Sequence, residues 1–358
     1  MQETKDFSFF NYLNTAATPI VIAEAGVNHN GCFEEAIRLI DAAYEAGAQG
    51  VKFQSFKAEK LALKETPKVP YQLKDEAHKG ESHYEMLKRL EMDYCSMQKL
   101  KKHADARGLL FLSTPYDPES ARELVKIGVG AIKVASADLI DYSIHQEILR
   151  SGLPLMQGLG MSRDDEVESL VNFYYKNNPH YPIVLLQCTS NYPANPLNAN
   201  LNFIPCLQEK YPQAMIGFSD HTNGSETACL ALAKGTRVFE KHFTRDRSQS
   251  GPDHKASCDP QQLKEYIDAL KRSDEILGDG EKKIAEEEKK MRRISRKGAY
   301  LCVDIKFGEV ISEDKLQFTR PALDFPMSEV YYLLGHKASH DLNAGHLLRK
   351  DDFLEESC

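Results

Sequence analysis

The sequence predicts an α/β protein made of a (β/α)8 TIM barrel and a small C-terminal β-rich domain. Short β-like runs alternate with amphipathic helical stretches from about residue 19 to about residue 277, and eight such runs can be counted. The chain of 358 residues is also long enough for two domains. Strand and helix alternation repeated over roughly 250 residues is typical of a TIM barrel, and an open doubly wound sheet is the alternative.

The expected strands are residues 19–25, 50–54, 109–113, 131–136, 154–158, 183–188, 214–219 and 236–242. The helical stretch after the first strand, residues 33–47, repeats apolar side chains at helical spacing and ends in the stop signal Gly47. Residues 57–90 are too long and too polar for an ordinary connection after a strand. We therefore expect an elaborated second loop over the mouth of the barrel.

The character of the chain changes at Gly278, where a highly charged run begins. We expect the barrel to occupy residues 1–280 and the charged run, residues 281–295, to be a solvated helix or linker. Residues 296–358 contain short strand-like pieces and turn signals, which predict a small second domain. A unit of this size is marginally stable by itself, so we expect it to be docked.

Composition and charge exclude several classes of protein. The hydrophobic fraction of 42% and the charged fraction of 27% are those of a globular protein, and the net charge of −8 argues against a nucleic-acid partner. No apolar run approaches the roughly 20 residues that span a bilayer, so we expect no membrane association. The N-terminus has no secretory signal pattern and the eight cysteines are scattered, which together predict a cytoplasmic protein with reduced thiols.

Two lysines lie within apolar strands, where burial is costly unless the lysine meets an anion. Lys52 and Lys133 therefore predict a shared negatively charged ligand, a phosphate or a carboxylate. The alternative is that they reach solvent or pair with a strand-end glutamate such as Glu24. Hydroxyl groups at neighbouring strand ends can complete the anion site: Thr114, Ser136, Ser190 and Ser219. In a TIM barrel, catalytic groups lie at these carboxyl ends of the strands.

Two histidines lie at neighbouring strand ends: His221 follows the seventh strand in GFSDHT, and His242 ends the eighth in FEKHFT. Neighbouring strands are about 4.8 Å apart, so both imidazoles can reach one divalent ion. With water and substrate oxygens completing the shell, Mn²⁺ or Mg²⁺ is expected, and two packing or hydrogen-bonding histidines are the alternative. Glu24, on the first strand beside the eighth, can orient a water molecule on that ion.

Two loops provide further polar groups. Tyr192, in the loop after the sixth strand, can face a sugar. Asp253 follows the eighth strand and lies near the metal candidates, where a carboxylate can bond a hydroxyl group or move a proton. A turn or helix cap is the structural alternative for Asp253.

The combination and order of nine motifs resemble the sialic acid (nonulosonic acid) synthase family. These motifs are AEAGVNHNG, VKFQSF, YEMLKRLEM, FLSTPYD, IKVASADL, CTSNYPA, IGFSDHT, FEKHFT and GPDHKAS, and they span nearly the whole chain. The last 60 residues resemble the antifreeze-like (SAF) domain of these synthases. The resemblance implies a barrel, this small domain and a domain-swapped homodimer.

The resemblance implies condensation of phosphoenolpyruvate with an N-acyl hexosamine, N-acetylmannosamine in the commonest case. The products would be phosphate and a 2-keto acid of the N-acetylneuraminate type. A legionaminate or pseudaminate synthase that uses a 2,4-diacetamido hexose is the alternative. The YEMLKRLEM tract is more similar to the neuraminate and legionaminate branches than to the pseudaminate branch.

The resemblance also implies a role for each candidate residue. Phosphoenolpyruvate would be held by Lys52, Thr114, Lys133, Ser136, Ser190 and Ser219. The sugar would be held by Gln54, Asp138, Tyr192, Asp253 and, from the partner subunit's small domain, the residue equivalent to Arg320. His221 and His242 would bind the metal as a Lewis acid for the sugar aldehyde, and Glu24 and Asp253 would position water or move protons.

The chain departs from the family pattern after the fifth strand. It has Gly158-Leu159-Gly160-Met161 where the family usually has Ser-Thr-Gly-Met, so either Gln157 compensates for a missing hydroxyl group or the anion site is looser.

Two rival functions remain. A synthase for a phosphorylated aldose needs a second phosphate site, for which no further Arg or Lys pair is found at strand ends. A non-catalytic sugar-binding scaffold would retain affinity without turnover.

Overall fold

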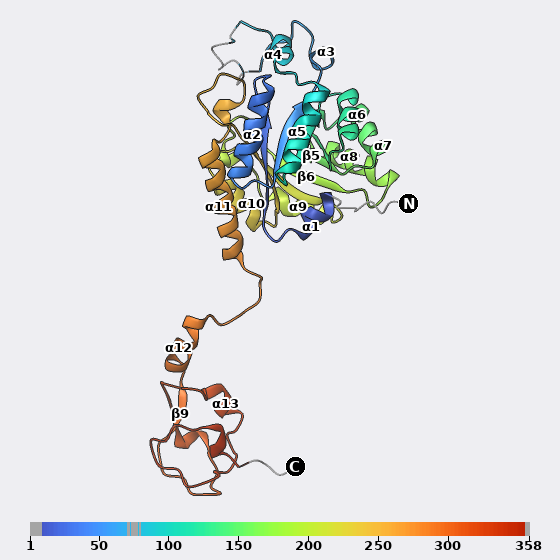
Figure 1. Ribbon diagram of the computed structural model, residues 1–358. Coiled ribbons are helices and arrows are strands. Elements are labelled where there is room, and N and C mark those ends of the chain that lie inside the picture. Colours follow the sequence, from blue (N-terminus) through green and yellow to red (C-terminus); the bar gives the residue numbers. More distant parts are fainter. Residues whose placement is uncertain (1–8, 70–71, 73–77, 79, 355–358) are drawn as a thin grey trace. The chain divides into compact units, whose positions relative to one another are not determined.

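The computed structural model describes residues 9–69, 72, 78 and 80–354 (Figure 1). The chain divides into two compact units, Met1–Gly278 and Asp279–Cys358. The first eight and the last four residues of the expected domains lie outside the described residues. Each unit is described by itself below.

Unit 1 contains eight parallel strands. They are β1 (Ile20–Gly26), β2 (Gly50–Ser55), β3 (Leu110–Pro115), β4 (Ile132–Val134), β5 (Leu155–Gly158), β6 (Ile183–Cys188), β7 (Met215–Asp220) and β8 (Val238–His242). The backbone ladders join them in the order β3-β2-β1-β8-β7-β6-β5-β4, and β3 lies in contact with β4. This closes the ring, and the predicted TIM barrel is confirmed. The fourth strand is shorter than expected because the chain turns into a 3-10 helix at Ser136.

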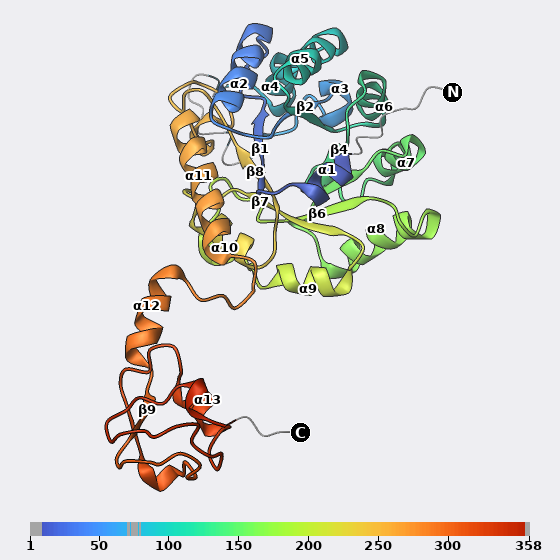
Figure 2. The same cartoon turned by 60° about the horizontal axis from the view of Figure 1, so that its bottom comes forward.

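Helices surround the strands of unit 1 (Figure 2). They are α1 (Phe9–Thr15), α2 (Phe33–Glu45), α3 (Ala58–Leu61), α4 (His83–Leu90), α5 (Tyr94–Ala106), α6 (Pro118–Ile127), α7 (Tyr142–Ser151), α8 (Asp164–Asn177), α9 (Phe203–Lys210), α10 (Glu226–Ala233) and α11 (Pro260–Leu277), with 3-10 helices η3 (Ser136–Asp138), η4 (Pro196–Asn198) and η5 (His254–Ala256). Asp117 caps α6 by accepting a hydrogen bond from the backbone of Ser120, and Pro118 occupies the first turn. Within the described residues, no helix has both the length and the apolar character needed to cross a membrane.

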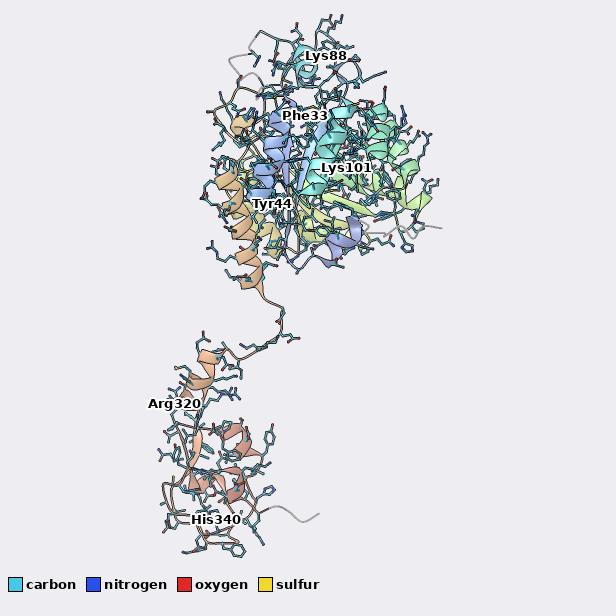
Figure 3. The ribbon with its side chains drawn as sticks, viewed as in Figure 1. Phe33, Tyr44, Lys88, Lys101, Arg320 and His340 are labelled. Atoms are coloured by element: carbon cyan, nitrogen blue, oxygen red, sulfur yellow. The ribbon has the colours of Figure 1, made fainter. Side chains whose placement is uncertain are left out.

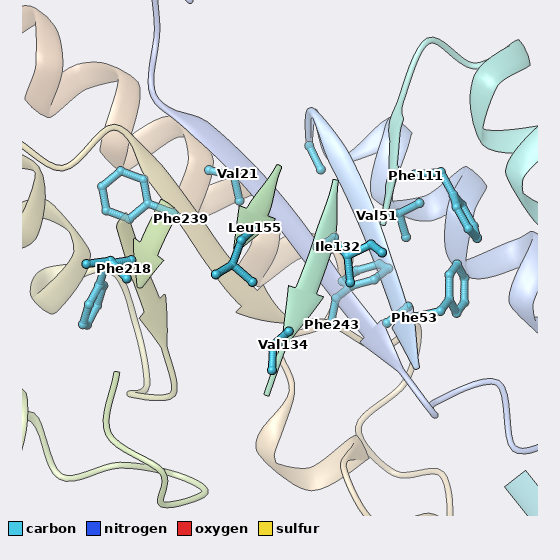
Figure 4. Packing of buried hydrophobic residues seen from close by; sticks show 14 of the residues in the cluster. Val21, Val51, Phe53, Phe111, Ile132, Val134, Leu155, Phe218, Phe239 and Phe243 are labelled. Carbon is cyan, nitrogen blue, oxygen red and sulfur yellow. The ribbon is translucent and has the colours of Figure 1, made fainter. Parts of the chain in front are cut away.

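Two apolar layers follow from the alternation of side chains along each strand. Outward-facing residues such as Val21, Phe53 and Phe239 pack under the helices (Figure 4). Inward-facing residues form a separate cluster inside the barrel: Ile20, Ile22, Leu112, Ala131, Met156, Val184, Leu186 and Val238. Phe9 and Leu13 of α1 pack against this cluster, at the end of the barrel where the strands begin. The interior is therefore a packed core at this end, and only the opposite end can open into a site.

Unit 2 is a small domain with its own core. It contains α12 (Glu286–Ser295), β9 (Gly298–Leu301), η6 (Glu313–Lys315), β10 (Leu316–Thr319), α13 (Met327–Tyr331) and η7 (Lys350–Asp352). Strands β9 and β10 pair antiparallel. Ile305, Ile311, Val330 and Leu348 are fully buried in the core of this domain. The charged run forms α12, which has no buried residue.

Candidate active site

A cavity of about 510 Å³ lies at the carboxyl ends of the barrel strands. Candidate residues from seven strands or their following loops line it: Glu24, Lys52, Gln54, Thr114, Lys133, Ser136, Ser190, Tyr192, Ser219, His221, His242 and Asp253. The roof comes from the segment expected over the mouth, through α3, α4 and the residues near them. The structure thus brings most of the predicted site residues together in one place.

Strand alternation explains why these side chains meet. Glu24 continues the inward row of Ile20 and Ile22 along β1, and Thr114 continues the inward row of Leu112 along β3. On β8 the inward row runs from Val238 through Glu240 and His242. Inward positions are therefore apolar at one end of the barrel and polar or charged at the other.

Two glutamates hold the two buried lysines. Lys52 Nζ lies 2.7 Å from Glu24 Oε2 and 3.7 Å from Glu240 Oε1, and its side chain is 3% exposed. Lys133 Nζ lies 4.0 Å from Glu240 Oε2, with 6% of its side chain exposed. Lys52 also donates to Thr114 Oγ1 at 3.1 Å. The pairing of a lysine with Glu24, which was the alternative to an anionic ligand, is present, and the barrel encloses both cations together.

Glu240 is a site residue that the sequence analysis missed. It lies between the two lysines and accepts a hydrogen bond from Ser219 Oγ at 3.2 Å. The signal was available, because Glu240 is two residues before His242 on the same strand and must face the same side.

The two glutamates have opposite pKa shifts. Burial raises the pKa of Glu24, and the neighbouring Lys52 only partly offsets this. Burial would also raise the pKa of Glu240, but the charges of Lys133 and Lys52 together hold it below its usual range. Burial lowers the pKa of Lys133 despite its proximity to Glu240. The site therefore pairs a glutamate that stays ionised with one that can hold a proton near neutral pH.

The glycines of the departing GLGM tract bring the backbone close to two site hydroxyl groups. A Cβ at Gly158 would lie 2.7 Å from Ser136 Oγ and 3.3 Å from Lys133 Nζ. A Cβ at Gly160 would collide with Ser190 Oγ, and the Gly160 amide donates to Ser136 Oγ at 3.0 Å. Ser136 Oγ thus occupies the space beside the lysine that a longer side chain at position 158 would enter.

Gln157 does not replace the missing hydroxyl group. Its amide nitrogen donates to the backbone carbonyl oxygens of Gly158 at 2.7 Å and Ala135 at 3.2 Å. It is fully buried and is not among the residues that line the cavity. The possibility that Gln157 compensates is therefore wrong, since its side chain stabilises the backbone beside the site.

The two histidine rings meet at the mouth, with centroids 5.3 Å apart. His221 Nδ1 lies 2.8 Å from the carbonyl oxygen of Thr189, so it donates there and leaves Nε2 as the acceptor. His242 Nδ1 is buried without a hydrogen-bond partner among the described residues. Two imidazoles with a nitrogen each to offer fit a divalent ion. In the described part of the chain no group of three or more His, Cys, Asp or Glu side chains could hold a metal, so other ligands would have to complete its shell.

Asp253 lies beside Glu24 and Gln54. All three carry an oxygen or nitrogen close to the position where Gly26 would have a Cβ, and Gly26 has a φ of +53° that favours glycine. Gln54 Nε2 donates to Glu24 Oε1 at 3.4 Å. Burial raises the pKa of Asp253 to about 6, although His221 and Lys52 act in the opposite direction. A carboxyl group of this kind can exchange a proton near neutral pH.

A buried histidine fixes the short helix that follows Asp253. His254 Nδ1 lies 2.7 Å from Thr244 Oγ1, and its Nε2 lies 3.1 Å from Asn30 Nδ2. The carbonyl oxygen of Asp253 accepts a hydrogen bond from Ser257 Oγ at 2.7 Å. The loop that carries Asp253 is therefore held by hydrogen bonds on both sides.

One predicted sugar ligand, Asp138, lies in η3 and is not among the residues that line the cavity. Arg320 is an exposed residue of unit 2, next to β10 (Figure 3). Its role depends on a contact between units, and it stays a prediction.

Removing the shared carboxylate should destabilise the protein. We expect Glu240→Gln to lower the free energy of unfolding by about 3–5 kcal/mol, because two buried lysines lose a counter-charge. The variant should also gain more thermal stability than the wild-type protein from added inorganic phosphate, which can replace that charge. Denaturant and thermal melts measure both effects. The control is Glu281→Gln, at a side chain that is 70% exposed; equal stability of Glu240→Gln and this control would contradict the expectation.

Comparisons with known proteins agree with the fold and the motifs. Two N,N'-diacetyllegionaminic acid synthases are each 38% identical to this chain. The one from Legionella pneumophila is matched over 93% of this chain and 94% of its own length, and the one from Campylobacter jejuni over 92% and 99%. A pseudaminic acid synthase from Campylobacter jejuni is 32% identical over 95% of this chain and 98% of its own.

A solved structure and two family models complete the comparison. The N-acetylneuraminic acid (sialic acid) synthetase of Leptospira borgpetersenii superposes with a TM-score of 0.66 at 32% identity, covering 76% of this chain and 90% of that chain. Residues 39–282 match the NeuB family and residues 296–354 match the SAF domain. The resemblance found in the motifs is confirmed: the chain belongs to the NeuB family of nonulosonic acid synthases and carries a C-terminal SAF domain.

Proposed function

We propose that the protein condenses phosphoenolpyruvate with a 2,4-diacetamido hexose to give phosphate and a nonulosonic acid of the legionaminate type. The observation that carries the proposal is the pair of buried lysines, Lys52 and Lys133, at the mouth of the barrel. They are the only lysine or arginine side chains among the described residues that line the cavity. This arrangement suits one anionic group and not two distant ones. It therefore argues against a phosphorylated aldose as the second substrate.

The anion site supports phosphoenolpyruvate as the first substrate. The positive charge of the two lysines is only partly balanced by Glu240, and a small dianion or trianion beside them would balance the rest. Thr114 and Ser219 already bond charged members of the cluster, and Ser136 and Ser190 lie beside the glycines after β5. Ser136 Oγ accepts from the Gly160 amide and lies 3.8 Å from Cys188 Sγ, and we expect its proton to turn to a ligand oxygen when one is bound.

The sugar would lie between this anion site and the loops after β6 and β8. The ring of Tyr192 lies with its centroid 4.2 Å from that of His221, and Gln54 and Asp253 meet near Gly26. His221 and His242 would hold Mn²⁺ or Mg²⁺, with water and sugar oxygens as further ligands. When bound, the ion would act as a Lewis acid on the aldehyde of the open-chain sugar.

The balance of the reaction assigns protons to the carboxyl groups. A bond forms between C3 of phosphoenolpyruvate and the aldehyde carbon, water adds at C2, and the bond from C2 to the phosphate oxygen breaks. Water loses both of its protons: the aldehyde oxygen gains one and the departing phosphate takes the other. Asp253 and Glu24 both have raised pKa values and lie together, so they can accept a proton from the water and supply one to the aldehyde oxygen.

The relatives favour a doubly acylated sugar over N-acetylmannosamine, which the motifs alone suggest as the commonest substrate. Both relatives at 38% identity are N,N'-diacetyllegionaminic acid synthases, and the pseudaminic acid synthase is less similar at 32%. N-acetylmannosamine is the second candidate, supported by the solved structure that matches this fold.

The first experiment measures phosphate release from phosphoenolpyruvate with added Mn²⁺ or Mg²⁺. We expect release with a 2,4-diacetamido hexose. We expect little with mannosamine 6-phosphate, because one anion site is present, and little with N-acetylmannosamine, because both relatives at 38% identity are N,N'-diacetyllegionaminic acid synthases. A chelator should abolish release and added metal should restore it. Release with the phosphorylated sugar alone would favour the rival synthase, and silence with every sugar from a folded protein would favour a binding scaffold.

The pH profile tests the role of Asp253. We expect kcat/KM to fall as pH falls through about 6, because protonation of Asp253 removes its ability to accept a proton. Asp253→Asn should lower kcat/KM by about 10²-fold or more and remove this limb of the profile. The matched control is Asp138→Asn, since burial and nearby Asp141 raise the pKa of Asp138 to about 6 as well but it lies off the cavity. If the decrease of kcat/KM at low pH disappears in Asp138→Asn and persists in Asp253→Asn, Asp138 and not Asp253 is the group responsible.

A swapped homodimer predicts that two inactive variants complement each other. Arg320→Ala and Lys133→Ala should each be inactive alone, and mixing them should restore part of the activity, because one site of the mixed dimer would contain both native residues. Phosphate release after verified subunit exchange is the measurement. No recovery would count against a site shared between subunits.

A further inference from the structure

The roof of the cavity differs in chemistry from its floor, which is formed by strand-end residues such as Lys52, Lys133 and Glu240. Its apolar residues come from the segment after β2: Leu61, Val69, Met86, Leu87 and Leu90. Among its described residues, the segment adds two polar side chains to the lining, Gln72 and His83, whose Oε1 and Nδ1 atoms are 3.2 Å apart and form a hydrogen bond. The described part of the roof is therefore mainly apolar.

Ion pairs and a helix cap hold the roof segment in place. Glu81 Oε1 lies 2.9 Å from Lys68 Nζ and 2.9 Å from Arg89 Nη2, and the Lys68 side chain is 2% exposed. A capping box between Ser82 and Glu85 fixes the start of α4. These contacts tie the segment before α4 to the last turn of the helix.

Helix α4 presents different faces to the cavity and to solvent. Met86, Leu87 and Leu90 are 6% exposed or less and line the cavity. Lys88 lies on the exposed side and pairs with Glu59 and Glu91 (Figure 3). The sequence of the helix thus directs its apolar side chains toward the substrate space.

An apolar roof discriminates between substituents on the sugar. Hydroxyl groups buried against Leu61 or Met86 would lose their bonds to water without gaining a partner, which is unfavourable. Methyl groups of acyl substituents would gain from leaving water at the same place. The polar groups of the same sugar can still reach the floor residues.

We infer that the apolar residues of the roof determine specificity by binding the methyl group of a second acylamino substituent. The inference rests on the proposed function and extends it by naming the residues that select a doubly acylated sugar over a singly acylated one. Met86, Leu87 and Leu90 form the fixed part of this surface, and Leu61 and Val69 its more accessible edge.

The test exchanges edge residues for polar ones of similar size. Leu61→Asn and Val69→Thr should each lower kcat/KM for the 2,4-diacetamido hexose by about tenfold, the effect expected from one mismatched group in an apolar pocket. The KM for phosphoenolpyruvate should change by less than about twofold, since the anion site is on the floor. The ratio of kcat/KM for the diacetamido sugar to that for N-acetylmannosamine should fall.

Leu63→Asn is the matched control, because Leu63 belongs to the same segment, is 78% exposed and does not line the cavity. We expect it to behave as the wild-type protein does. An equal loss in Leu63→Asn and Leu61→Asn, or an unchanged ratio between the two sugars in Leu61→Asn and Val69→Thr, would overturn the inference.

Calorimetric titration separates failure of the inference from failure of the proposed function. If the wild-type protein releases no phosphate with any sugar, the proposed synthase activity fails. Tighter binding of the diacetamido sugar to wild-type protein than to Leu61→Asn would still support the roof as its recognition surface. No binding, or equal binding to both proteins, would overturn the inference as well.

Discussion

Buried positive charge at the mouth of the barrel is the constraint on which the rest of the site depends. Lys52 and Lys133 are enclosed where water cannot solvate them, and such a position is tolerated only with counter-charge in place. Glu24 and Glu240 supply it from the neighbouring strands β1 and β8. Glu240 stands 3.7 Å and 4.0 Å from the two lysines, and the proposed function places an anionic substrate beside them.

Much of the barrel was predictable because each strand is a short apolar run, and inward residues alternate with outward ones. The same rule predicts that Glu24, Lys52 and His242 meet. Glu240 was overlooked since it stands in a charged FEKH tract, where Lys241 is its neighbour. Lys241 faces outward and pairs with buried Asp220 at 3.0 Å, so alternation, and not charge alone, separates site residue from structural residue.

Residues in loops were harder to place, for a physical reason. Glu81, just before α4, pairs with Lys68 and with Arg89 of the helix, and the apolar pattern of α4 does not report these ion pairs. Asp138 follows a strand end, but the chain turns there into a 3-10 helix and Asp138 is not among the residues that line the cavity. Apolar periodicity reports neither the ion pairs of Glu81 nor this turn.

The floor and the roof of the cavity therefore differ in what determines their side chains. The floor is fixed by barrel geometry, so even the departure at Gly158 is absorbed locally, with Ser136 Oγ filling the space beside Lys133. Because any anion-binding member of this fold needs such a floor, its motifs identify the family without naming the sugar. The apolar side chains of the roof form no ion pairs with the buried charges, so they can change without disturbing the charge balance below. The proposal therefore assigns sugar preference to Leu61 and its neighbours and anion binding to the two lysines.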